Sequence, residues 1–370
     1  MEAGNPMNRL HKASKFWLKE SGKFASREFK YSQAAYFGRK VTPYIGWIGF
    51  SNFGDEILYD AHKSLFCGQQ LLPYRNVNKK SHERYSGFGI LGGGTLINQS
   101  ERWMSQLQGL QKSGLTTFCL GTGVSNEKSR PIESNSQLTD WLPLLRSMKF
   151  VGVRGPISLR HLNNAGFYDA AIVGDSALAL APDISSYKKD ARGIIGLNFG
   201  YSNATRMASK SLYLDELVFF AKRVIKSGYR IKLVPVTPED VSSNLLFLQR
   251  LGSDAQACTL HEPTINLNEY FSYIEGCDAF IGQKLHATIA AIMLRIPSIM
   301  IAYQEKCLDF MESMSMAHFA IESDTLKASQ LISMFDDLLA DGQNVSIELD
   351  RYVSQYRAGL VSHASRLLQS

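Results

Sequence analysis

Three basic side chains and a histidine follow short apolar runs in this sequence of 370 residues. Arg154 comes after FVGV, Lys284 and His286 come after AFIG, and Lys306 comes after SIMIA. Arginine and lysine bind phosphate and carboxylate groups. A histidine at the start of a helix stays close to neutral, because the helix dipole disfavours imidazolium there, and it suits acid–base chemistry. If the four side chains lie together, they predict a site for a small anion with several negative charges.

Each of these side chains also has an ordinary structural interpretation, which the sequence leaves open. Arg154 pairs in that case with a buried carboxylate, for example Asp175, which follows the run AIVG. His286 is then a core histidine, and Lys306 is a lysine on the solvated surface. Asp175 is alternatively an acid of the site itself. The presence of Lys284 two residues before His286 leaves the two interpretations of the histidine balanced.

Carboxylates follow the first apolar run, YIGWIGF, in the segment SNFGDE at residues 51–56. Gly54 permits a sharp turn there, and Asp55 or Glu56 can accept a proton from a sugar hydroxyl. Asn52 and Gly54 are candidates for a cradle around an acceptor molecule. The alternative is that Asp55 only caps the following helix.

Three consecutive glycines and Thr95 follow the apolar run FGIL. Glycines let a ligand approach the backbone closely, and N–H groups at a helix start attract anions or hydroxyls. Gly93, Gly94 and Thr95 are therefore further candidates for the cradle. The segment is neither a dinucleotide-binding GxGxxG motif nor a phosphate-binding GxxxxGK[ST] motif.

Apolar runs alternate with stretches of helical period from residue 41 onward. The runs predict strands at Tyr44–Phe50, Phe88–Leu91, Thr116–Leu120, Phe150–Val153, Ala171–Val173, Ile194–Asn198, Ile231–Val236, Ala279–Ile281 and Ser298–Ala302. The periodic stretches predict helices at Glu56–Phe66, Glu101–Lys112, Ile157–Asn163, Leu212–Lys226, Asn268–Glu275 and His286–Leu294. This alternation indicates an α/β fold with parallel sheets, in which ligands bind beyond the carboxyl ends of the strands.

The polar stretch at residues 181–192 lacks a periodic apolar face and predicts a linker between two Rossmann-like domains. We expect an N-terminal domain at residues 41–182 and a C-terminal domain at residues 193–325. A helical tail at residues 326–370 should pack back on the body. Two such domains that face each other form a central cleft, which is lined by the turns described above.

The N-terminal 40 residues carry the whole net charge of +6. They hold nine Lys and Arg against three Glu, whereas residues 41–370 hold 31 basic and 31 acidic side chains. A basic segment with interleaved aromatic residues suits adsorption on an anionic membrane surface. The alternative is an ordinary solvated helix packed on the body. The neutral body argues against nucleic acid as a partner.

The composition, 45% apolar and 20% charged, is that of a folded soluble chain and excludes disordered and fibrous proteins. The five cysteines are scattered without a CxxC pair, and the first residues lack the apolar core of a secretory signal. We therefore expect a cytoplasmic protein, which is peripheral at the inner face of the membrane if residues 1–40 adsorb there. No residues have metal-ligand spacing, and we expect no metal.

Taken together, the turns resemble those of the polysaccharide pyruvyl transferase family. The resemblance rests on GFSNFGDE (49–56), GGGT (92–95), GTGV (121–124), VRGPIS (153–158), VGDSAL (173–178), QKLHA (283–287) and PSIMIAYQEK (297–306). It implies two Rossmann-like domains facing a central cleft, the GT-B architecture. It also implies transfer of pyruvate from phosphoenolpyruvate to sugar hydroxyls of a surface polysaccharide or its lipid-linked precursor, usually as a cyclic ketal, with no cofactor.

The resemblance also implies roles for individual residues. Those that match the donor-binding positions of the family are Arg154, Lys284, Leu285, His286 and Lys306. His286 is the candidate general acid or base, and the carboxylates that would activate or orient acceptor hydroxyls are Asp55, Glu56 and Asp175. The family commonly has arginine where this chain has Lys284, so that the charge is kept but the bidentate geometry is lost.

Two other functions compete with this interpretation. A sugar-nucleotide-dependent glycosyltransferase has the same architecture but a different donor, which a thermal-shift comparison of phosphoenolpyruvate with a nucleotide sugar distinguishes. A non-catalytic protein of polysaccharide assembly is the third alternative, with Lys284 as the sign of lost activity. The presence of Arg154, His286 and Lys306 argues against the third alternative.

Overall fold

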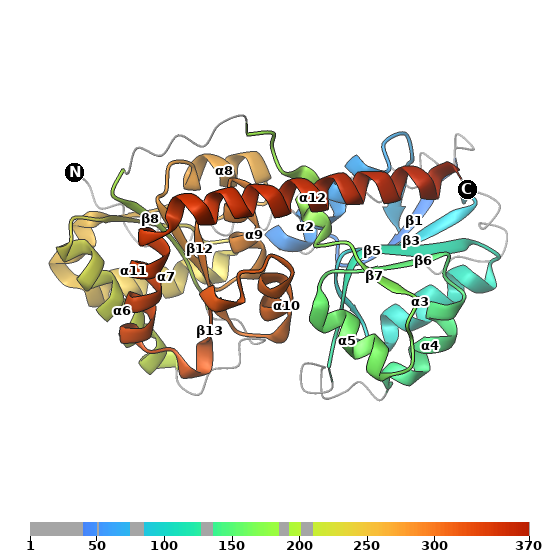
Figure 1. Cartoon of the computed structure of the whole chain (residues 1–370), viewed down its shortest axis with the longest axis horizontal. Helices are drawn as coiled ribbons and strands as arrows, with labels where there is room; N and C mark the ends of the chain where they lie inside the picture. Colours follow the sequence, from blue (N-terminus) through green and yellow to red (C-terminus); the bar gives the residue numbers. More distant parts are fainter. Residues whose placement is uncertain are drawn as a thin grey trace.

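The computed structural model describes residues 40–49, 52–74, 85–126, 136–184, 192–200 and 210–369. Residues 1–39 of the predicted basic segment and residues 185–191 of the predicted linker lie outside the described residues. Within the described part, the chain forms two parallel β-sheets, which lie side by side and are covered by helices (Figure 1). We call the unit around the first sheet the N-terminal domain and the unit around the second the C-terminal domain.

The N-terminal sheet has the strand order β2-β1-β3-β5-β6-β7, and β4 pairs with β5. Its strands are β1 (Thr42–Ile45), β2 (Leu71–Pro73), β3 (Phe88–Leu91), β4 (Gly94–Ile97), β5 (Thr116–Val124), β6 (Phe150–Val153) and β7 (Ala170–Ile172). All of these pairings are parallel. Central strands of a parallel sheet are buried on both faces, which explains why β3, β5 and β6 are continuous apolar runs in the sequence.

The C-terminal sheet has the order β10-β9-β8-β11-β12-β13 and is also parallel. Its strands are β8 (Ile194–Asn198), β9 (Arg230–Leu233), β10 (Cys258–Leu260), β11 (Ala279–Gly282), β12 (Ser298–Ala302) and β13 (Ala320–Glu322). The central strands β8, β11 and β12 agree with the sequence prediction to within one residue. The short edge strands β10 and β13 were not predicted, because they lack an apolar run.

Helices follow most strands. The described helices are α2 (Phe53–Leu65), α3 (Glu101–Lys112), α4 (Leu138–Arg146), α5 (Pro156–Asn164), α6 (Lys210–Lys226), α7 (Pro238–Leu251), α8 (Leu267–Ile274), α9 (Leu285–Met293), α10 (Glu305–Ser313), α11 (Ala328–Ala340) and α12 (Gly342–Gln369). Five of the described helices, α2, α3, α4, α7 and α8, begin with a side-chain cap or a capping box. Asn52 caps α2 by accepting a hydrogen bond from the Gly54 N–H at 2.9 Å. Pro156 occupies the first turn of α5, as predicted, because its fixed φ suits that position.

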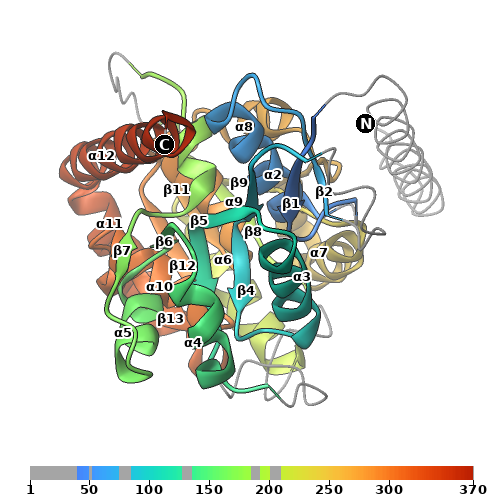
Figure 2. The ribbon, with the colours of Figure 1, turned by 90° about the vertical axis from the view of Figure 1, so that its right-hand side faces the viewer.

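The long helix α12 crosses from the C-terminal domain to the N-terminal domain (Figures 1 and 2). Its Tyr356 hydroxyl donates to the carbonyl of Ser313 at 2.9 Å, and its His363 ring stacks on Phe150 of β6 at 4.7 Å. The same tyrosine ring packs against Gly174, where a Cβ would lie only 2.7 Å from it. These contacts tie both domains to one helix.

Two local predictions were wrong. The first apolar run does not form a strand over Tyr44–Phe50, because β1 begins at Thr42 and ends at Ile45. The glycine-rich segment does not open a helix, because Gly94–Ile97 forms β4 beside β5 and the next helix starts at Glu101. Gly94 adopts a φ of +95°, a conformation that favours glycine over residues with a Cβ.

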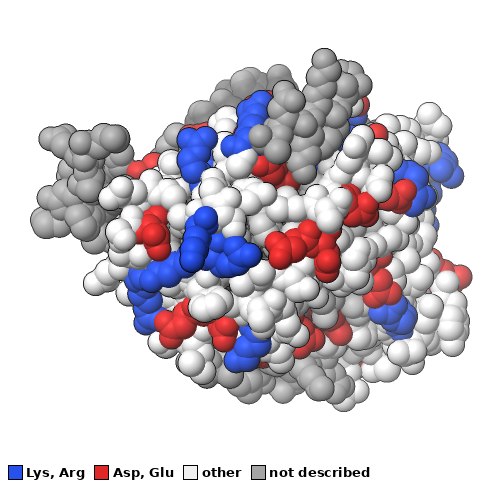
Figure 3. Space-filling model, turned by 60° about the vertical axis from the view of Figure 1, so that its left-hand side comes forward, with Lys and Arg blue, Asp and Glu red and all other residues white. Residues whose placement is uncertain are grey.

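The surface of the C-terminal side carries charges of both signs. On the face shown in Figure 3, a group of adjoining Lys and Arg side chains lies beside separate groups of Asp and Glu side chains. Among the described residues, no helix combines the length and the apolar character that crossing a lipid bilayer requires.

Candidate active site

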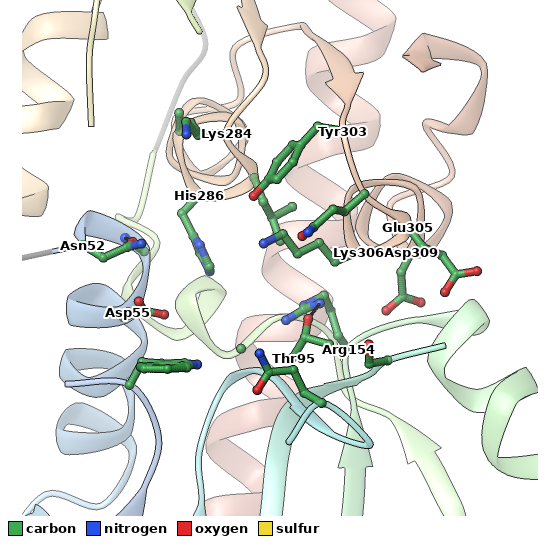
Figure 4. Close-up of a pocket in the computed structure, with 18 of the residues that line it drawn as sticks. Asn52, Asp55, Thr95, Arg154, Lys284, His286, Tyr303, Glu305, Lys306 and Asp309 are labelled. Carbon is green, nitrogen blue, oxygen red and sulfur yellow. Dashed lines mark hydrogen bonds between the residues drawn. The ribbon is translucent and has the colours of Figure 1, made fainter. Parts of the chain in front are cut away.

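A pocket of about 550 Å³ lies between the two domains at the carboxyl ends of their strands. Figure 4 shows the side chains that reach it from the N-terminal domain, Asn52, Asp55, Thr95 and Arg154, and from the C-terminal domain, Lys284, His286, Tyr303 and Lys306. Strand ends that are far apart in the sequence thus meet at one place, as expected for facing Rossmann-like domains.

Arg154 lies directly after β6, and a carboxylate on the side away from the pocket fixes its guanidinium. Its Nε donates to Oδ2 of Asp175 at 2.9 Å, and both side chains are almost fully buried. Its Nη1 lies 3.4 Å from the Thr95 hydroxyl, whereas Nη2 has no hydrogen-bond partner among the described residues. Gly123 makes room for the guanidinium, since a Cβ there would lie 2.6 Å from Nη1. Arg154 is therefore fixed in place with one donor group unused.

His286 lies in the first turn of α9, after Lys284 as the N-cap residue. Its Nε2 is 3.8 Å from Oδ2 of Asp175, too far for a hydrogen bond, and has no such partner among the described residues. Burial lowers the pKa of His286 to about 4; Asp175 opposes the shift, and Arg154 and Lys306 add to it. The imidazole is thus neutral near pH 7, as the sequence predicted for this position.

Gly54 has a structural role that the sequence did not reveal. It lies inside α2, and a Cβ at this position would be 2.1 Å from Nδ1 of His286. Real Cβ atoms do not approach other atoms so closely, so only glycine fits beside the ring. Helix α2 of the N-terminal domain therefore contacts His286 of the C-terminal domain directly.

Two lysines flank Tyr303 but differ in their partners. Nζ of Lys306 lies 4.9 Å from the centre of the tyrosine ring, and Nζ of Lys284 lies 6.0 Å from it. Lys284 also lies 3.5 Å from Oδ1 of the buried Asp240. Among the described residues, Lys306 has no carboxylate within ion-pair distance. Lys306 is thus the lysine whose charge is available to a ligand.

Asp55 lines the pocket from the first turn of α2. Burial raises the pKa of Asp55 to about 7; Lys306 opposes the shift, and Glu56 adds to it. The carboxyl therefore exchanges protons near neutral pH, where a general acid or base works best. The cap of α2 is Asn52 and not Asp55, so the alternative role of Asp55 as the helix cap does not hold.

Three predicted residues do not line the pocket. Glu56 is 3% exposed and accepts a hydrogen bond from the Gly49 N–H at 2.6 Å, which holds the chain before α2. Gly93 packs against Ser176, with 2.6 Å between the position of a Cβ and the serine oxygen. Asp175 is fully buried behind Arg154 and His286. Gly94, Thr95 and Leu285 do line the pocket.

Trp47, Gln99, Ser125 and Asp309 also line the pocket but were not predicted. Trp47 belongs to an apolar run, which indicated a strand, and the other three are common polar residues outside any motif. Ser125 could have been predicted from the sequence, because it directly follows the GTGV segment at the carboxyl end of an apolar run, where ligands bind in parallel sheets.

Asp309 joins the two domains next to the pocket. One carboxylate oxygen accepts from the N–H groups of Ile157 and Ser158 at 2.9 and 3.1 Å, and the other accepts from the Ser158 hydroxyl at 2.7 Å. A residue of α10 thus caps α5, the helix that follows Arg154. Because Lys306 lies in the first turn of α10, this contact fixes the two cations relative to each other.

The described residues include no group of three or more His, Cys, Asp or Glu side chains that could hold a metal ion. The pocket instead gathers cations, a neutral imidazole and several carboxyls, of which Asp55 has a pKa raised to about 7 by burial. These groups can bind an anion and exchange protons with it.

Solved structures with a similar fold support the architecture. A UDP-GlcNAc 2-epimerase from Neisseria meningitidis bound to UDP-GlcNAc is 8% identical, with a TM-score of 0.56 over 90% of this chain and 100% of that chain. A putative UDP-N-acetylglucosamine 2-epimerase from Listeria monocytogenes is 9% identical, with a TM-score of 0.56 over 89% and 95%. MurG from Acinetobacter baumannii is 11% identical, with a TM-score of 0.50 over 90% and 99%. At such identities the likeness shows the fold alone, and it confirms the predicted GT-B architecture.

The sequence comparison identifies the family. No curated protein matches the sequence at a significant level. The family model for polysaccharide pyruvyl transferase matches residues 52–305, which include Asp55, Arg154, His286 and the strands and helices between them. This match covers more than half of the chain. The chain therefore belongs to the polysaccharide pyruvyl transferase family.

Proposed function

We propose that this transferase moves pyruvate from phosphoenolpyruvate onto two hydroxyls of a sugar in a surface polysaccharide or its precursor, as a cyclic ketal. The observation that carries the proposal is the convergence of Arg154, Lys306 and His286 in one pocket, where Nη2 of Arg154 and Nε2 of His286 have no hydrogen-bond partner among the described residues. Phosphoenolpyruvate has a phosphate and a carboxylate on the same carbon atom, which suits two fixed cations from facing domains.

The two cations have different roles in this proposal. Arg154 is preorganised by Asp175, so its free N–H group can bind an anion without first losing side-chain freedom. Lys306 supplies a charge that no carboxylate neutralises among the described residues. Lys284 is already paired with Asp240, so it contributes less charge than its position in the sequence suggested.

The proposed reaction balances with these groups and no cofactor. The methylene carbon of phosphoenolpyruvate gains a proton and becomes a methyl group, and the adjacent carbon becomes an electrophile. One sugar hydroxyl adds to that carbon; a second then replaces phosphate as the C–O bond to phosphate breaks. Of the two hydroxyl protons, one is accounted for in the methyl group and the other in the released phosphate. Arg154 and Lys306 stabilise the charge that develops on the departing phosphate.

Asp55 and His286 divide the proton transfers. Because burial raises the pKa of Asp55 to about 7, its protonated form is available near neutral pH to protonate the methylene carbon. His286 is neutral and can accept a proton from an attacking hydroxyl. A bound phosphoenolpyruvate adds negative charge beside both groups and so raises the pKa of each. We assign Asp175 the role of positioning Arg154 and His286, because it is buried behind them.

The location of the acceptor stays a prediction. A lipid-linked precursor would bring the enzyme to the inner face of the membrane, where the basic segment at residues 1–40 would bind anionic lipid. That segment lies outside the described residues, except for Lys40.

The experiment that tests the function is turnover with defined substrates. The full-length protein is incubated with phosphoenolpyruvate and the methyl glycosides of galactose, glucose and mannose, and phosphate release and the mass of the glycoside are measured. Lys306→Met should weaken phosphoenolpyruvate binding about 10-fold or more, through loss of a charge-assisted contact. Lys222→Met on the exposed face of α6 is the matched control and should bind normally.

Three outcomes would contradict the proposal. One is no binding of phosphoenolpyruvate by the wild-type protein. Another is equal binding by Lys306→Met and Lys222→Met. The third is thermal stabilisation by UDP-GlcNAc without stabilisation by phosphoenolpyruvate, which would favour a sugar-nucleotide-dependent glycosyltransferase.

A further inference from the structure

The pocket has two walls of different chemistry. The side chains from β11, β12 and the helices after them supply Lys284, His286 and Lys306. The N-terminal domain supplies Asp55 and Arg154, and beside them an uncharged part of the wall, formed after β1 and in or just after β4 and β5. The members of this uncharged part are Trp47, Gly94, Thr95, Gln99, Val124 and Ser125. The pocket thus offers an uncharged surface with an aromatic ring next to a charged surface, which suits two chemically different molecules.

Trp47 is held in place by a second tryptophan. Its ring meets the ring of Trp103 edge to face, with centres 4.9 Å apart and an interplanar angle of 79°. Trp103 is 1% exposed and belongs to α3. The Arg102 guanidinium lies 5.6 Å from the centre of the Trp47 ring and 4.7 Å from that of Trp103. Trp47 is thus a large aromatic surface in the pocket wall with a rigid support.

Trp103 also determines how Gln99 faces the pocket. The indole N–H of Trp103 donates to Oε1 of Gln99 at 2.7 Å. Because an indole nitrogen only donates, the amide oxygen must face it, and the NH₂ group of Gln99 is left for another acceptor. The sequence places Gln99 just after β4, so this donor lies on the same wall as Trp47.

Ser125 adds a hydroxyl to this wall at the end of β5. Its backbone N–H donates to Ile97 at 2.9 Å, and its carbonyl accepts from the Asn98 side chain at 2.8 Å. Asn98 has a φ of +57°, a strained conformation that the asparagine–Ser125 bond helps to hold. The hydroxyl of Ser125 is therefore presented by a fixed backbone.

We propose that Trp47, Gln99 and Ser125 form the subsite for the acceptor sugar, an inference that rests on the proposed function. A pyranose has one face of C–H groups, which packs on an aromatic ring, and a rim of hydroxyls, which need both donors and acceptors. Trp47 supplies the ring, the amide of Gln99 supplies a donor, and the hydroxyl of Ser125, which itself donates to the Asn126 carbonyl at 3.4 Å, supplies an acceptor. An uncharged wall of this kind does not compete for the anionic donor substrate.

The position of Thr95 connects this subsite to the reacting atoms. Thr95 lines the same wall in β4, and its hydroxyl lies 3.4 Å from Nη1 of Arg154. A sugar stacked on Trp47 therefore borders the site where Arg154 would hold phosphoenolpyruvate. The two substrates must lie next to each other in this way if two sugar hydroxyls are to attack phosphoenolpyruvate.

The test separates sugar binding from binding of the donor. Methyl glycosides of galactose, glucose and mannose are titrated into the full-length protein with phosphoenolpyruvate present, and binding is followed by calorimetry and saturation-transfer NMR. At least one glycoside should bind, with the strongest saturation on the C–H protons of one ring face. Trp47→Ala should weaken that binding about 10-fold, because the buried apolar area is lost. Trp47→Phe should keep most of it.

Two further variants act as controls. Tyr168→Ala removes an aromatic side chain that is 75% exposed on the same domain, and it should leave sugar binding unchanged. Gln99→Glu keeps an acceptor for the Trp103 N–H but replaces the free amide donor with an oxygen, and it should weaken sugar binding with the fold intact. Thermal melting of each variant checks the fold. All of these variants except Gln99→Glu should bind phosphoenolpyruvate within about twofold of the wild type.

The failures of the two proposals are distinguishable. If the wild-type protein binds phosphoenolpyruvate but none of the glycosides, the acceptor subsite is wrong and the donor assignment stands. If Trp47→Ala binds the glycoside as well as the wild type does, or loses phosphoenolpyruvate to the same extent, the subsite is also wrong. If phosphoenolpyruvate does not bind the wild type, the proposed function itself fails.

Discussion

The two domains meet at two pairs of helices that are held in opposite ways. At the α5–α10 contact, Asp309 caps α5, the Arg160 guanidinium binds Glu312 through two bonds of 2.6 and 2.8 Å, and His161 meets Glu305 at 2.8 Å. At the α2–α9 contact, Gly54 packs directly against the ring of His286. One contact is polar and directional, and the other depends on the absence of a side chain.

This difference indicates that one contact sets the orientation of the two domains, whereas the other positions a catalytic group. Directional hydrogen bonds between α5 and α10 specify how the domains are oriented, and both helices begin beside a cation of the pocket, Arg154 or Lys306. The glycine contact places the imidazole, and it leaves no space for adjustment. We therefore expect substitutions at α2–α9 to affect turnover first, and substitutions at α5–α10 to affect stability first.

The largest effect is expected for Gly54→Ala. The new Cβ would collide with Nδ1 of His286, and a displacement of about 1 Å can lower turnover about 100-fold. Alanine has a higher helix propensity than glycine, so α2 itself should not be weakened. Steady-state rates of the purified variant, together with its circular dichroism and phosphoenolpyruvate affinity, measure this effect.

Gly87→Ala is the matched control for that substitution, because a Cβ at Gly87 would meet nothing within 4 Å. It should turn over normally. If Gly54→Ala retains near-normal turnover, the imidazole can move without loss, and the proposed role of His286 in proton transfer is contradicted.

A smaller effect, mainly on stability, is expected for Asp309→Ala. The substitution removes a buried carboxylate that accepts three hydrogen bonds and leaves the first turn of α5 uncapped. The cost should be about 2–3 kcal/mol in the free energy of unfolding, measured by urea denaturation. Asp337→Ala on the exposed face of α11 should cost much less. Equal losses in the two variants would show that the α5–α10 contact does not stabilise the protein.

The sequence predicted the elements that hold these residues better than it predicted the contacts. β6 and β12 have the predicted bounds because their apolar runs are bordered by polar residues, and the start of α9 follows from the change in periodicity at His286. α10 was not predicted, so Lys306 was assigned to a strand end although it lies in a helical first turn.

The contacts themselves depend on packing between distant segments. Nothing near Gly54 in the sequence indicates that His286 will fill the space beside it, and nothing near Asp309 indicates that it caps α5. The pairing of Lys284 with Asp240 is equally hidden, because it arises from the end of β11 meeting the start of α7. Such pairs follow from the arrangement of the strands and helices, which the local sequence does not contain.

Asp55 in α2 should also make the stability of the protein depend on pH. Because the pKa of Asp55 is raised to about 7, the folded protein holds a proton between about pH 4 and 7 that the unfolded chain releases. Protonated Asp55 thus stabilises the fold at low pH, and this contribution is lost as the pH rises toward 7. Asp55→Asn should therefore gain stability relative to the wild type on going from pH 5 to pH 8.

Asp60→Asn on the exposed side of the same helix is the control for this pH dependence. Its stability relative to the wild type should change little between the two pH values. If Asp55→Asn behaves in the same way, the carboxyl is ionised at pH 5, and it cannot be the proton donor that we propose.

The smallest effect should come from the exposed pair at the α5–α10 contact. The Arg160 and Glu312 side chains are 55% and 35% exposed, so water and salt screen their attraction although the geometry is bidentate. A double-mutant cycle with Arg160→Ala and Glu312→Ala should give a coupling of about 0.5–1 kcal/mol, which falls at 1 M salt. The loss for Asp309→Ala should persist at that salt concentration, because its partners are buried. A coupling as large as the Asp309 effect would mean that surface charge, and not the buried cap, aligns the two domains.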